Sequence, residues 1–211
     1  MRFGNIEVRF SMRNGLIIVR KSGGRAEVIA FGSKQTSVRY GELWADALSH
    51  CPTPPPGERR VLMLGLAGGG ALSAIYEKYN TCSITAIEYD MEMVKIARAL
   101  QLQAPRPFPE VIEGDAGEEL VRLKRRFDLI VVDIFRGIVP SPLIAEDNFL
   151  HALKEHLKPW GVVVINTVNA EMYLEAARHA FAHSHTHTNG GNVFGIFSES
   201  ALLDSNQGPS P

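Results

Sequence analysis

The stretch from Arg60 to Asp90, which reads RVLMLGLAGGGALSAIYEKYNTCSITAIEYD, constrains this chain more than any other. Its apolar run Val61–Leu64 is typical of a strand that is buried on both faces. The run ends at a glycine-rich loop, Gly65–Gly70, and a helical pattern follows through Tyr79. Strand, loop and helix in this order predict the first unit of a nucleotide-binding fold.

A second apolar segment, Ile84–Ile87, ends on Glu88, which lies 23 residues after Gly65. This spacing is close to the roughly 20 residues typical of nucleotide-binding units. A carboxylate there suits the two neighbouring hydroxyls of a ribose, since both are donors. A tight turn and a surface carboxylate are the plainer interpretations, but the agreement between the loop and Glu88 favours a nucleoside site. Ala67, in place of a glycine, favours S-adenosylmethionine over the pyrophosphate-containing NAD.

The composition is that of an ordinary globular protein, with 45% hydrophobic and 21% charged residues and a net charge of −1. This balance predicts neither nucleic-acid nor membrane binding. The sequence has no apolar run of membrane-spanning length and no signal-peptide core. Cys51 and Cys82 fit no metal or redox motif, and two unpaired thiols suit a reducing compartment. We therefore expect a cytoplasmic protein.

Apolar and turn patterns divide the chain into three parts. Residues 1–50 are predicted to form an N-terminal β-ribbon and a short helix over Leu43–His50, followed by a proline-rich boundary. Residues 51–200 alternate strand and helix patterns and close with a hairpin turn at Asn189–Gly191. This alternation predicts an α/β Rossmann-like fold, in which a mostly parallel sheet carries helices on both faces. Residues 201–211 are expected to be a frayed tail.

Over about residues 26–168 the chain resembles the spermidine synthases, or polyamine aminopropyltransferases, of the class I S-adenosylmethionine-dependent methyltransferase superfamily. Gln35 resembles the family's cofactor-contacting Gln, and Gly65–Gly70 occupies the place of its glycine loop. Glu88-Tyr89-Asp90 resembles its ribose-binding E-x-D motif, and Asp115-Ala116 its adenine-contacting motif. The resemblance implies that S-adenosylmethionine, or its decarboxylated form, is bound by Gln35, Gly65, Ala67, Gly69, Glu88, Tyr89, Asp90, Asp115, Ala116 and Asp133.

The acceptor side departs from the family's pattern. The family's loop D-S-x-D-P-x-G-P is Asp133–Pro140 here, and Arg136 replaces the Asp that the family uses to deprotonate the attacking amine. Its Y-[HQ]-E motif is matched to Trp44-Ala45-Asp46, and its fifth-strand Gln to Asn166. The resemblance therefore assigns Trp44, Asp46, Arg136 and Asn166 to the acceptor pocket.

The change at Arg136 decides the predicted reaction. An alkyl ammonium with a pKa of roughly 10 cannot attack a sulfonium until it loses a proton, and a guanidinium cannot take that proton. We therefore expect a methyltransferase with a non-polyamine acceptor, either a small molecule or a peptide. One alternative is a polyamine aminopropyltransferase whose catalytic base is Asp133 or Asp46. Another is a noncatalytic nucleoside-binding homologue, in which Asp133 only orders its loop.

Three histidines, His183, His185 and His187, alternate near the C-terminus and would share one face of a strand. No Cys or carboxylate accompanies them in the sequence, so they are interpreted as an exposed strand rim and no metal site is predicted.

The N-terminal ribbon bears on assembly. Ile6–Phe31 carries apolar strands that are too few to make a core of their own. The related synthases associate through this segment, so the resemblance implies a homodimer.

Overall fold

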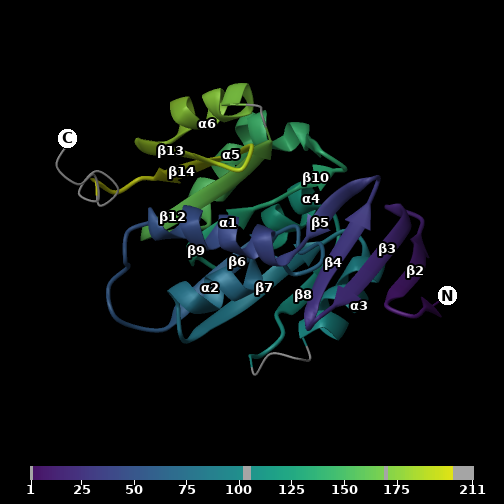
Figure 1. The fold of residues 1–211 in the computed structure, drawn as a ribbon. Helices are drawn as coiled ribbons and strands as arrows, with labels where there is room; N and C mark the ends of the chain where they lie inside the picture. The colour runs from purple at the N-terminus through teal and green to yellow at the C-terminus, as the bar shows by residue number, and fades with distance from the viewer. Residues whose placement is uncertain (1, 102–105, 169–170, 202–211) are drawn as a thin grey trace.

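The computed structural model describes residues 2–101, 106–168 and 171–201, and a seven-stranded sheet forms its centre (Figure 1). Residues 202–211 of the predicted tail lie outside the described residues. The strands of the central sheet are β6 (Arg59–Leu64), β7 (Cys82–Glu88), β8 (Glu110–Glu113), β9 (Phe127–Val132), β12 (Leu157–Val168), β13 (His183–Asn189) and β14 (Asn192–Ser198).

The strands lie in the order β13-β14-β12-β9-β6-β7-β8. Strands β8, β7, β6, β9 and β12 are parallel to one another, whereas β14 is antiparallel to β12 and β13 is antiparallel to β14. The predicted hairpin turn at Asn189–Gly191 joins these last two strands. The Rossmann-like fold predicted from the alternating pattern is confirmed.

Helices cover both faces of the central sheet (Figure 1). Alternate side chains of a strand point to opposite faces. Met63 and Val131 therefore pack with α1, α2 and part of α3, whereas Leu64 and Val132 pack with α4, α5 and α6. The helices are α1 (Val38–Ser49), α2 (Leu72–Lys78), α3 (Met91–Gln101), α4 (Ala116–Arg122), α5 (Asp147–Glu155) and α6 (Glu175–Ala180), with short 3₁₀ turns η1 (Pro142–Ala145) and η2 (Glu171–Leu174).

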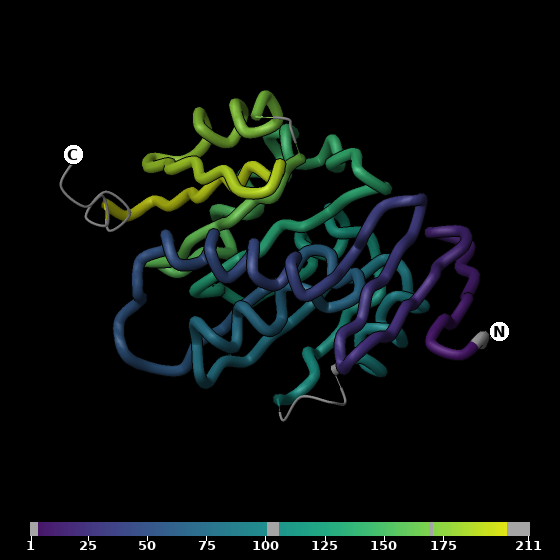
Figure 2. Tube along the Cα trace, viewed as in Figure 1, coloured from purple at the N-terminus to yellow at the C-terminus, as the bar shows by residue number. Residues whose placement is uncertain are grey.

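The predicted N-terminal ribbon is an antiparallel sheet of β1 (Arg2–Phe3), β2 (Ile6–Ser11), β3 (Gly15–Ser22), β4 (Arg25–Ala30) and β5 (Ser33–Thr36). It lies at the opposite end of the molecule from the β13–β14 hairpin (Figure 2). Its buried side chains Ile17 and Val19 pack against Met93 and Ile96 of α3. The ribbon thus obtains its core from the main part of the chain.

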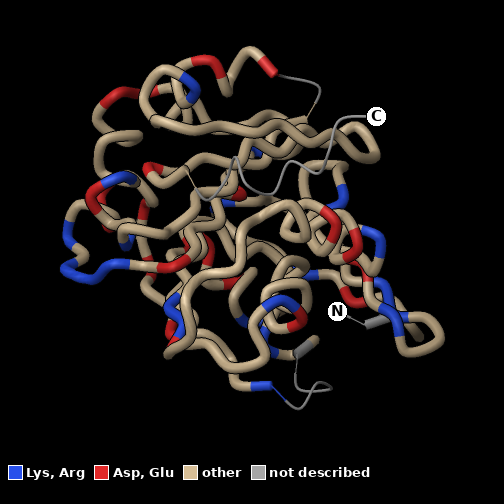
Figure 3. Tube along the Cα trace, turned by 90° about the vertical axis from the view of Figure 1, so that its left-hand side faces the viewer, with Lys and Arg blue, Asp and Glu red and all other residues tan. Residues whose placement is uncertain are grey.

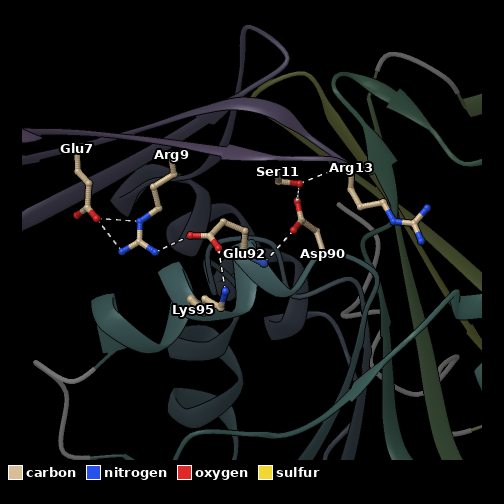
Figure 4. A network of polar contacts seen from close by, with 7 residues as sticks. All are labelled: Glu7, Arg9, Ser11, Arg13, Asp90, Glu92 and Lys95. Carbon is tan, nitrogen blue, oxygen red and sulfur yellow. Dashed lines mark hydrogen bonds and ion pairs between the residues drawn. The ribbon is translucent and has the colours of Figure 1, made fainter. Parts of the chain in front are cut away.

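Charged and polar residues also attach β2 to α3 (Figure 4). The Arg9 guanidinium pairs with Glu7 of its own strand and, at 2.7 Å, with Glu92 of α3. The Ser11 hydroxyl donates to the carboxylate of Asp90, just before α3. These bonds place the β2–β3 turn beside the C-terminal end of β7.

Helix α1 begins at Val38, five residues before the predicted start at Leu43. Its N-cap is Ser37, whose hydroxyl accepts a hydrogen bond from the Tyr40 amide at 3.2 Å. The prediction followed the apolar residues alone and overlooked this cap. The difference places Tyr40 in the first turn of a helix that packs against the central sheet.

Lys and Arg are interspersed with Asp and Glu over the face shown in Figure 3. In the part of the chain that the structure describes, none of the helices combines the length and the apolar character needed to cross a membrane.

Candidate functional site

The chemically important residues gather where the parallel strands end. Gly65, Glu88 and Asp133 end or follow β6, β7 and β9, and parallel strands meet at one edge by their carboxyl ends. A cavity of about 930 Å³ opens at this edge, between the strand ends, the N-terminal sheet and α1. The predicted site residues that line it are Gln35, Gly65, Ala67, Glu88, Tyr89, Asp115, Ala116, Asp133 and Arg136.

The loop after β6 is shaped by backbone requirements. Gly65 has φ +85°, and a Cβ there would lie 2.4 Å from the carbonyl oxygen of Asp133. Ala67 also has a positive φ, 45°, a conformation that costs an L residue about 1–2 kcal/mol. Gly69 does not line the main cavity, because the loop turns there toward a second cavity of about 760 Å³. The cofactor contact of Gly69 stays a prediction that this lining does not support.

Glu88 holds the glycine loop in place. Its Oε2 accepts hydrogen bonds from the amides of Leu66 and Ala67 at 2.8 and 2.9 Å, and its Oε1 accepts one from Asp90 at 2.9 Å. Burial raises the pKa of Glu88, although these bonds oppose the shift. Oε1 has a single donor in this structure and retains acceptor capacity for a hydroxyl on the cavity side. The carboxylate can thus serve the loop and a ribose together.

Asp115 and Asp90 have separate local roles. Asp115 caps α4, because its Oδ1 accepts from the Gly117 amide at 2.8 Å, and it also lines the cavity. Asp90 is only 4% exposed and accepts from Asn14 at 2.6 Å as well as from Ser11. Asp90 joins the β2–β3 turn to α3 and does not line the cavity, and its contact with the cofactor stays a prediction that this position does not support.

A polar cluster surrounds the carboxylate of Asp133. The Tyr40 hydroxyl lies 2.7 and 2.9 Å from the two carboxylate oxygens, and the Asn166 amide nitrogen lies 2.9 Å from Oδ1. Burial raises the pKa of Asp133, and the nearby charge of Glu88 adds to this, against the hydrogen bonds from Asn166 and Tyr40. Burial and the charge of Asp133 also raise the pKa of Tyr40 well above its ordinary value.

Two features leave this cluster ready to accept a positive charge. Among the described residues, no Lys, Arg or His forms an ion pair with Asp133. Two buried side-chain atoms near it, the acceptor Asn166 Oδ1 and the donor Trp44 Nε1, have no hydrogen-bond partner in the same part of the chain. Buried polar atoms normally have a partner, and the unpaired carboxylate charge of Asp133 beside them suits a cationic group.

Neither Trp44 nor Asp46 lines the cavity, and their assignment to the acceptor pocket stays a prediction. Trp44 is fully buried in the core, where its ring packs edge-on against Phe194 at a centroid distance of 5.1 Å. Asp46 lies two residues further along α1 and is bonded to His187 and Asn189. Trp44 lies one turn after Tyr40 on the same face of α1, and its indole N–H opposes the rise in the pKa of Asp133, so Trp44 borders the polar cluster around that carboxylate. Asp46 lies on a different face of the helix.

Tyr40 was missed by the sequence reasoning. The sequence contains two signals that point to Tyr40. Ser37 is a good N-cap for a helix that begins just before Tyr40. In addition, Tyr40-Gly41-Glu42 fits a Y-x-E pattern, four residues before the Trp44-Ala45-Asp46 segment that was matched to the family motif. Asn166 bonds to Asp133 and Tyr40 but does not line the cavity, and its assignment to the acceptor pocket stays a prediction.

Arg136 belongs to the outer wall of the cavity. It lies on the short strand β10 (Phe135–Arg136), which pairs with β11 (Val139–Pro140). The residue is exposed, and its guanidinium carbon lies 5.8 Å from the ring centroid of Phe31. The sequence prediction was that Arg136 replaces the family's base and cannot act as one, and the exposed position of Arg136 in the cavity wall leaves the base to another residue.

The chain is similar to proteins of a known family. The model of the spermine/spermidine synthase domain matches residues 43–196. The chain belongs to this family. Polyamine aminopropyltransferase 1 of Pseudomonas aeruginosa is 26% identical over 178 residues, covering 82% of this chain and 62% of the relative. The polyamine aminopropyltransferase of Desulforudis audaxviator is 28% identical over 141 residues, covering 64% of this chain and 51% of the relative.

Solved structures share the fold of this chain. A spermidine synthase in complex with the transition-state analogue AdoDATO has a TM-score of 0.78 at 16% identity, and the match covers 99% of this chain and 78% of that one. Human methyltransferase-like protein 13 has a lower TM-score of 0.59 at 17% identity, over 82% of this chain and 92% of that one.

The predicted methyltransferase with a non-polyamine acceptor is wrong. The family model and these curated relatives, which are polyamine aminopropyltransferases, support the alternative. The chain spans only about half to three-fifths of the length of these two relatives.

Proposed function

We propose that this chain is a polyamine aminopropyltransferase. It would move an aminopropyl group from decarboxylated S-adenosylmethionine to a small amine and release methylthioadenosine. The observation that carries the proposal is the Asp133 carboxylate, which lies at the strand ends with Tyr40 and Asn166 beside it and no cationic partner among the described residues.

The cluster suits an alkyl ammonium. A carboxylate and the free Oδ1 of Asn166 offer acceptors only, whereas an ammonium offers donors only. Glu88 lines the same cavity, and its charge adds to the negative potential at Asp133. Both effects favour the entry of an amine in its charged form, which must then lose a proton before it reacts.

Asp133 would take this proton. Because burial raises its pKa, Asp133 is a better proton acceptor than an ordinary aspartate. The Tyr40 hydroxyl and the Asn166 amide fix the direction of the carboxylate, so that the nitrogen lone pair faces the carbon under attack. The new N–C bond forms as the C–S bond breaks, and the electron pair of that bond neutralises the sulfonium.

The opposite side of the cavity fits the nucleoside part of the sulfonium substrate. Gly65 lets the loop pass close to Asp133, since a Cβ would overlap the carbonyl there. Glu88 keeps an acceptor on Oε1 for a ribose hydroxyl, and Asp115 and Ala116 line the wall beyond it. When bound, decarboxylated S-adenosylmethionine supplies a charged leaving group, so alignment of the amine is the chief demand on the protein.

The test is turnover of decarboxylated S-adenosylmethionine and putrescine by the full chain, measured as methylthioadenosine release. Replacing Asp133 by Asn keeps the shape but removes the base, so the rate should fall about 10²–10⁴-fold. Asp147→Asn, at an exposed carboxylate of α5, is the matched control and should keep the wild-type rate. A wild-type chain that binds methylthioadenosine but turns over none of the common polyamines would contradict the proposal. That result would indicate a noncatalytic nucleoside-binding protein.

A further inference from the structure

A second cluster of ionisable residues lies near the C-terminal end of α1, beside the β13–β14 hairpin and outside the lining of the cavity. Asp46 and His50, four residues apart, share one face of α1. His187 comes from β13, at the edge of the central sheet. One ligand atom of each residue lies within 4.8 Å of the other two. Two elements that are distant in the sequence therefore bring a carboxylate and two imidazoles together.

The contacts within this cluster are close. His187 Nε2 lies 2.6 Å from Asp46 Oδ2, and the ring centroids of His50 and His187 are 4.2 Å apart. The ring of His185, two residues before His187 on the same strand face, stacks on His50 at 5.5 Å. The side chains converge on one point between the helix and the strand.

The carboxylate is oriented by a further residue. The Asn189 amide donates to Asp46 Oδ2 at 2.6 Å. The Asp46 carboxylate is thus held in one orientation by two partners, Asn189 and His187. Carboxylates bind metals in the ionised form and imidazoles in the neutral form.

We propose that Asp46, His50 and His187 form a binding site for a borderline divalent transition metal of the Zn²⁺ type. Two imidazoles and a carboxylate are a frequent ligand set of zinc, and hard cations such as Mg²⁺ and Ca²⁺ prefer all-oxygen sites. Metal–ligand distances of about 2.0–2.2 Å require ligand atoms roughly 3.4 Å apart, which small side-chain rotations supply. His185 or a water completes the tetrahedron. The sequence prediction of no metal site counted only the strand histidines and overlooked the ligands from α1.

Such a metal would clamp the β13–β14 hairpin onto α1. The turn of this hairpin already packs on the helix, since a Cβ at Gly190 would lie 3.1 Å from the Leu43 side chain. Gly190 and Leu43 also line the main cavity, and Tyr40 lies one turn before Leu43. The metal would therefore stabilise one wall of the cavity without entering it, independently of which reaction the cavity supports.

The first experiment measures metal binding directly. Full-length protein without a polyhistidine tag, stripped with a chelator, is titrated with Co²⁺, and the visible d–d absorption is followed. We expect one Co²⁺ per chain, displaced by Zn²⁺. His50→Ala and His187→Ala should each weaken binding at least about tenfold. His151→Ala is the matched control, because His151 is an exposed histidine paired with Glu155 at 3.5 Å and belongs to no such cluster among the described residues.

The second experiment distinguishes loss of the site from loss of the fold. Zn²⁺ at about a hundredfold excess over its dissociation constant should raise the Tm of the wild-type protein and of His151→Ala by about 5 °C or more. His187→Ala, if its metal-free Tm is close to wild type, should show no such rise. Wild-type protein that binds no Co²⁺ at micromolar concentration, or cluster variants that keep wild-type affinity, would overturn the proposal.

Discussion

The hydroxyl of Tyr40 lies within 2.9 Å of both carboxylate oxygens of Asp133, although the two residues are 93 positions apart in the chain. The Ser37 cap fixes Tyr40 in the first turn of α1, and β9 fixes Asp133 at the sheet edge. The bond therefore joins the helix that covers the sheet to the strand end where the proposed reaction takes place.

Tyr40→Phe tests this relationship. The substitution removes a hydrogen bond to a charged group, worth about 1.5–3 kcal/mol, and should lower kcat/KM for methylthioadenosine release roughly 10–100-fold. Tyr76→Phe is a suitable control, because it removes the hydroxyl that donates to the Pro107 carbonyl at 2.6 Å, outside the main cavity. Equal effects of the two substitutions would show that Tyr40 acts only through stability.

The Tyr40–Asp133 contact also shows which parts of the structure can be predicted from the sequence and which cannot. The buried strands were identified because uninterrupted apolar runs such as Val61–Leu64 and Leu129–Val132 have few alternative structures. The start of α1 was misplaced because its first turn is polar on both sides of Tyr40 and only the Ser37 cap marks it. The cluster of Asp46, His50 and His187 was not found, since its members meet only through the packing of α1 on the β13–β14 hairpin.

The glycine loop offers a second prediction. Gly65→Ala places a Cβ 2.4 Å from the Asp133 carbonyl oxygen at a φ of +85°, so backbone strain and overlap act together. We expect the free energy of unfolding to fall by about 2–4 kcal/mol, measured by urea denaturation. Methylthioadenosine binding, measured by calorimetry, should weaken as well.

Gly24→Ala provides the control for Gly65→Ala. Gly24 has a similar φ of +76°, but an added Cβ would meet nothing within 4 Å. The free energy of unfolding of Gly24→Ala should therefore fall only by the cost of backbone strain, about 1–2 kcal/mol. A loss at Gly24 as large as that at Gly65 would mean that the contact with Asp133 contributes nothing.

A buried ion pair away from the cavity predicts a pH dependence of stability. Burial opposes ionisation of Asp128, but the Lys158 ammonium at 2.7 Å and the N–H groups of Arg60 and Trp160 outweigh it and hold the pKa of Asp128 below its ordinary value. A carboxyl whose pKa is lowered by folding stabilises the protein above its unfolded pKa of about 3.9, and this contribution is lost as pH falls through that region.

Asp128→Ala should therefore lower the free energy of unfolding by about 3 kcal/mol at pH 7, because it leaves Lys158 without its partner. The difference in the free energy of unfolding between wild type and Asp128→Ala should stay constant between about pH 5 and 8 and become smaller below about pH 4. Urea denaturation at several pH values measures this difference. Glu113→Ala, at an exposed carboxylate of β8, serves as the control and should show no such pH-dependent difference. A difference that is the same at pH 4 and pH 7 would rule out ionisation of Asp128 as its source.

The outer face of the N-terminal sheet predicts self-association. Phe10 and Leu16 are paired across β2 and β3 and are 68% and 57% exposed, with Ile6 on the same face at 39%. The opposite face of these strands is buried within the chain, since Ile17 and Val19 pack against α3. An exposed apolar face of this kind on a sheet usually marks an interaction site, and we propose that a second copy of the chain covers it.

Phe10→Glu tests that proposal, because a carboxylate in the centre of a buried apolar contact would have no partner. Light scattering should give about twice the chain mass of 23.2 kDa for the wild-type protein and 23.2 kDa for Phe10→Glu. Met172→Glu is the matched control: Met172 is 78% exposed on η2, so the same change there adds a charge to a surface that the proposed contact does not use. A wild-type chain of 23.2 kDa at micromolar concentration, or an equal loss of association in both variants, would show that the Phe10–Leu16 face does not hold two copies together.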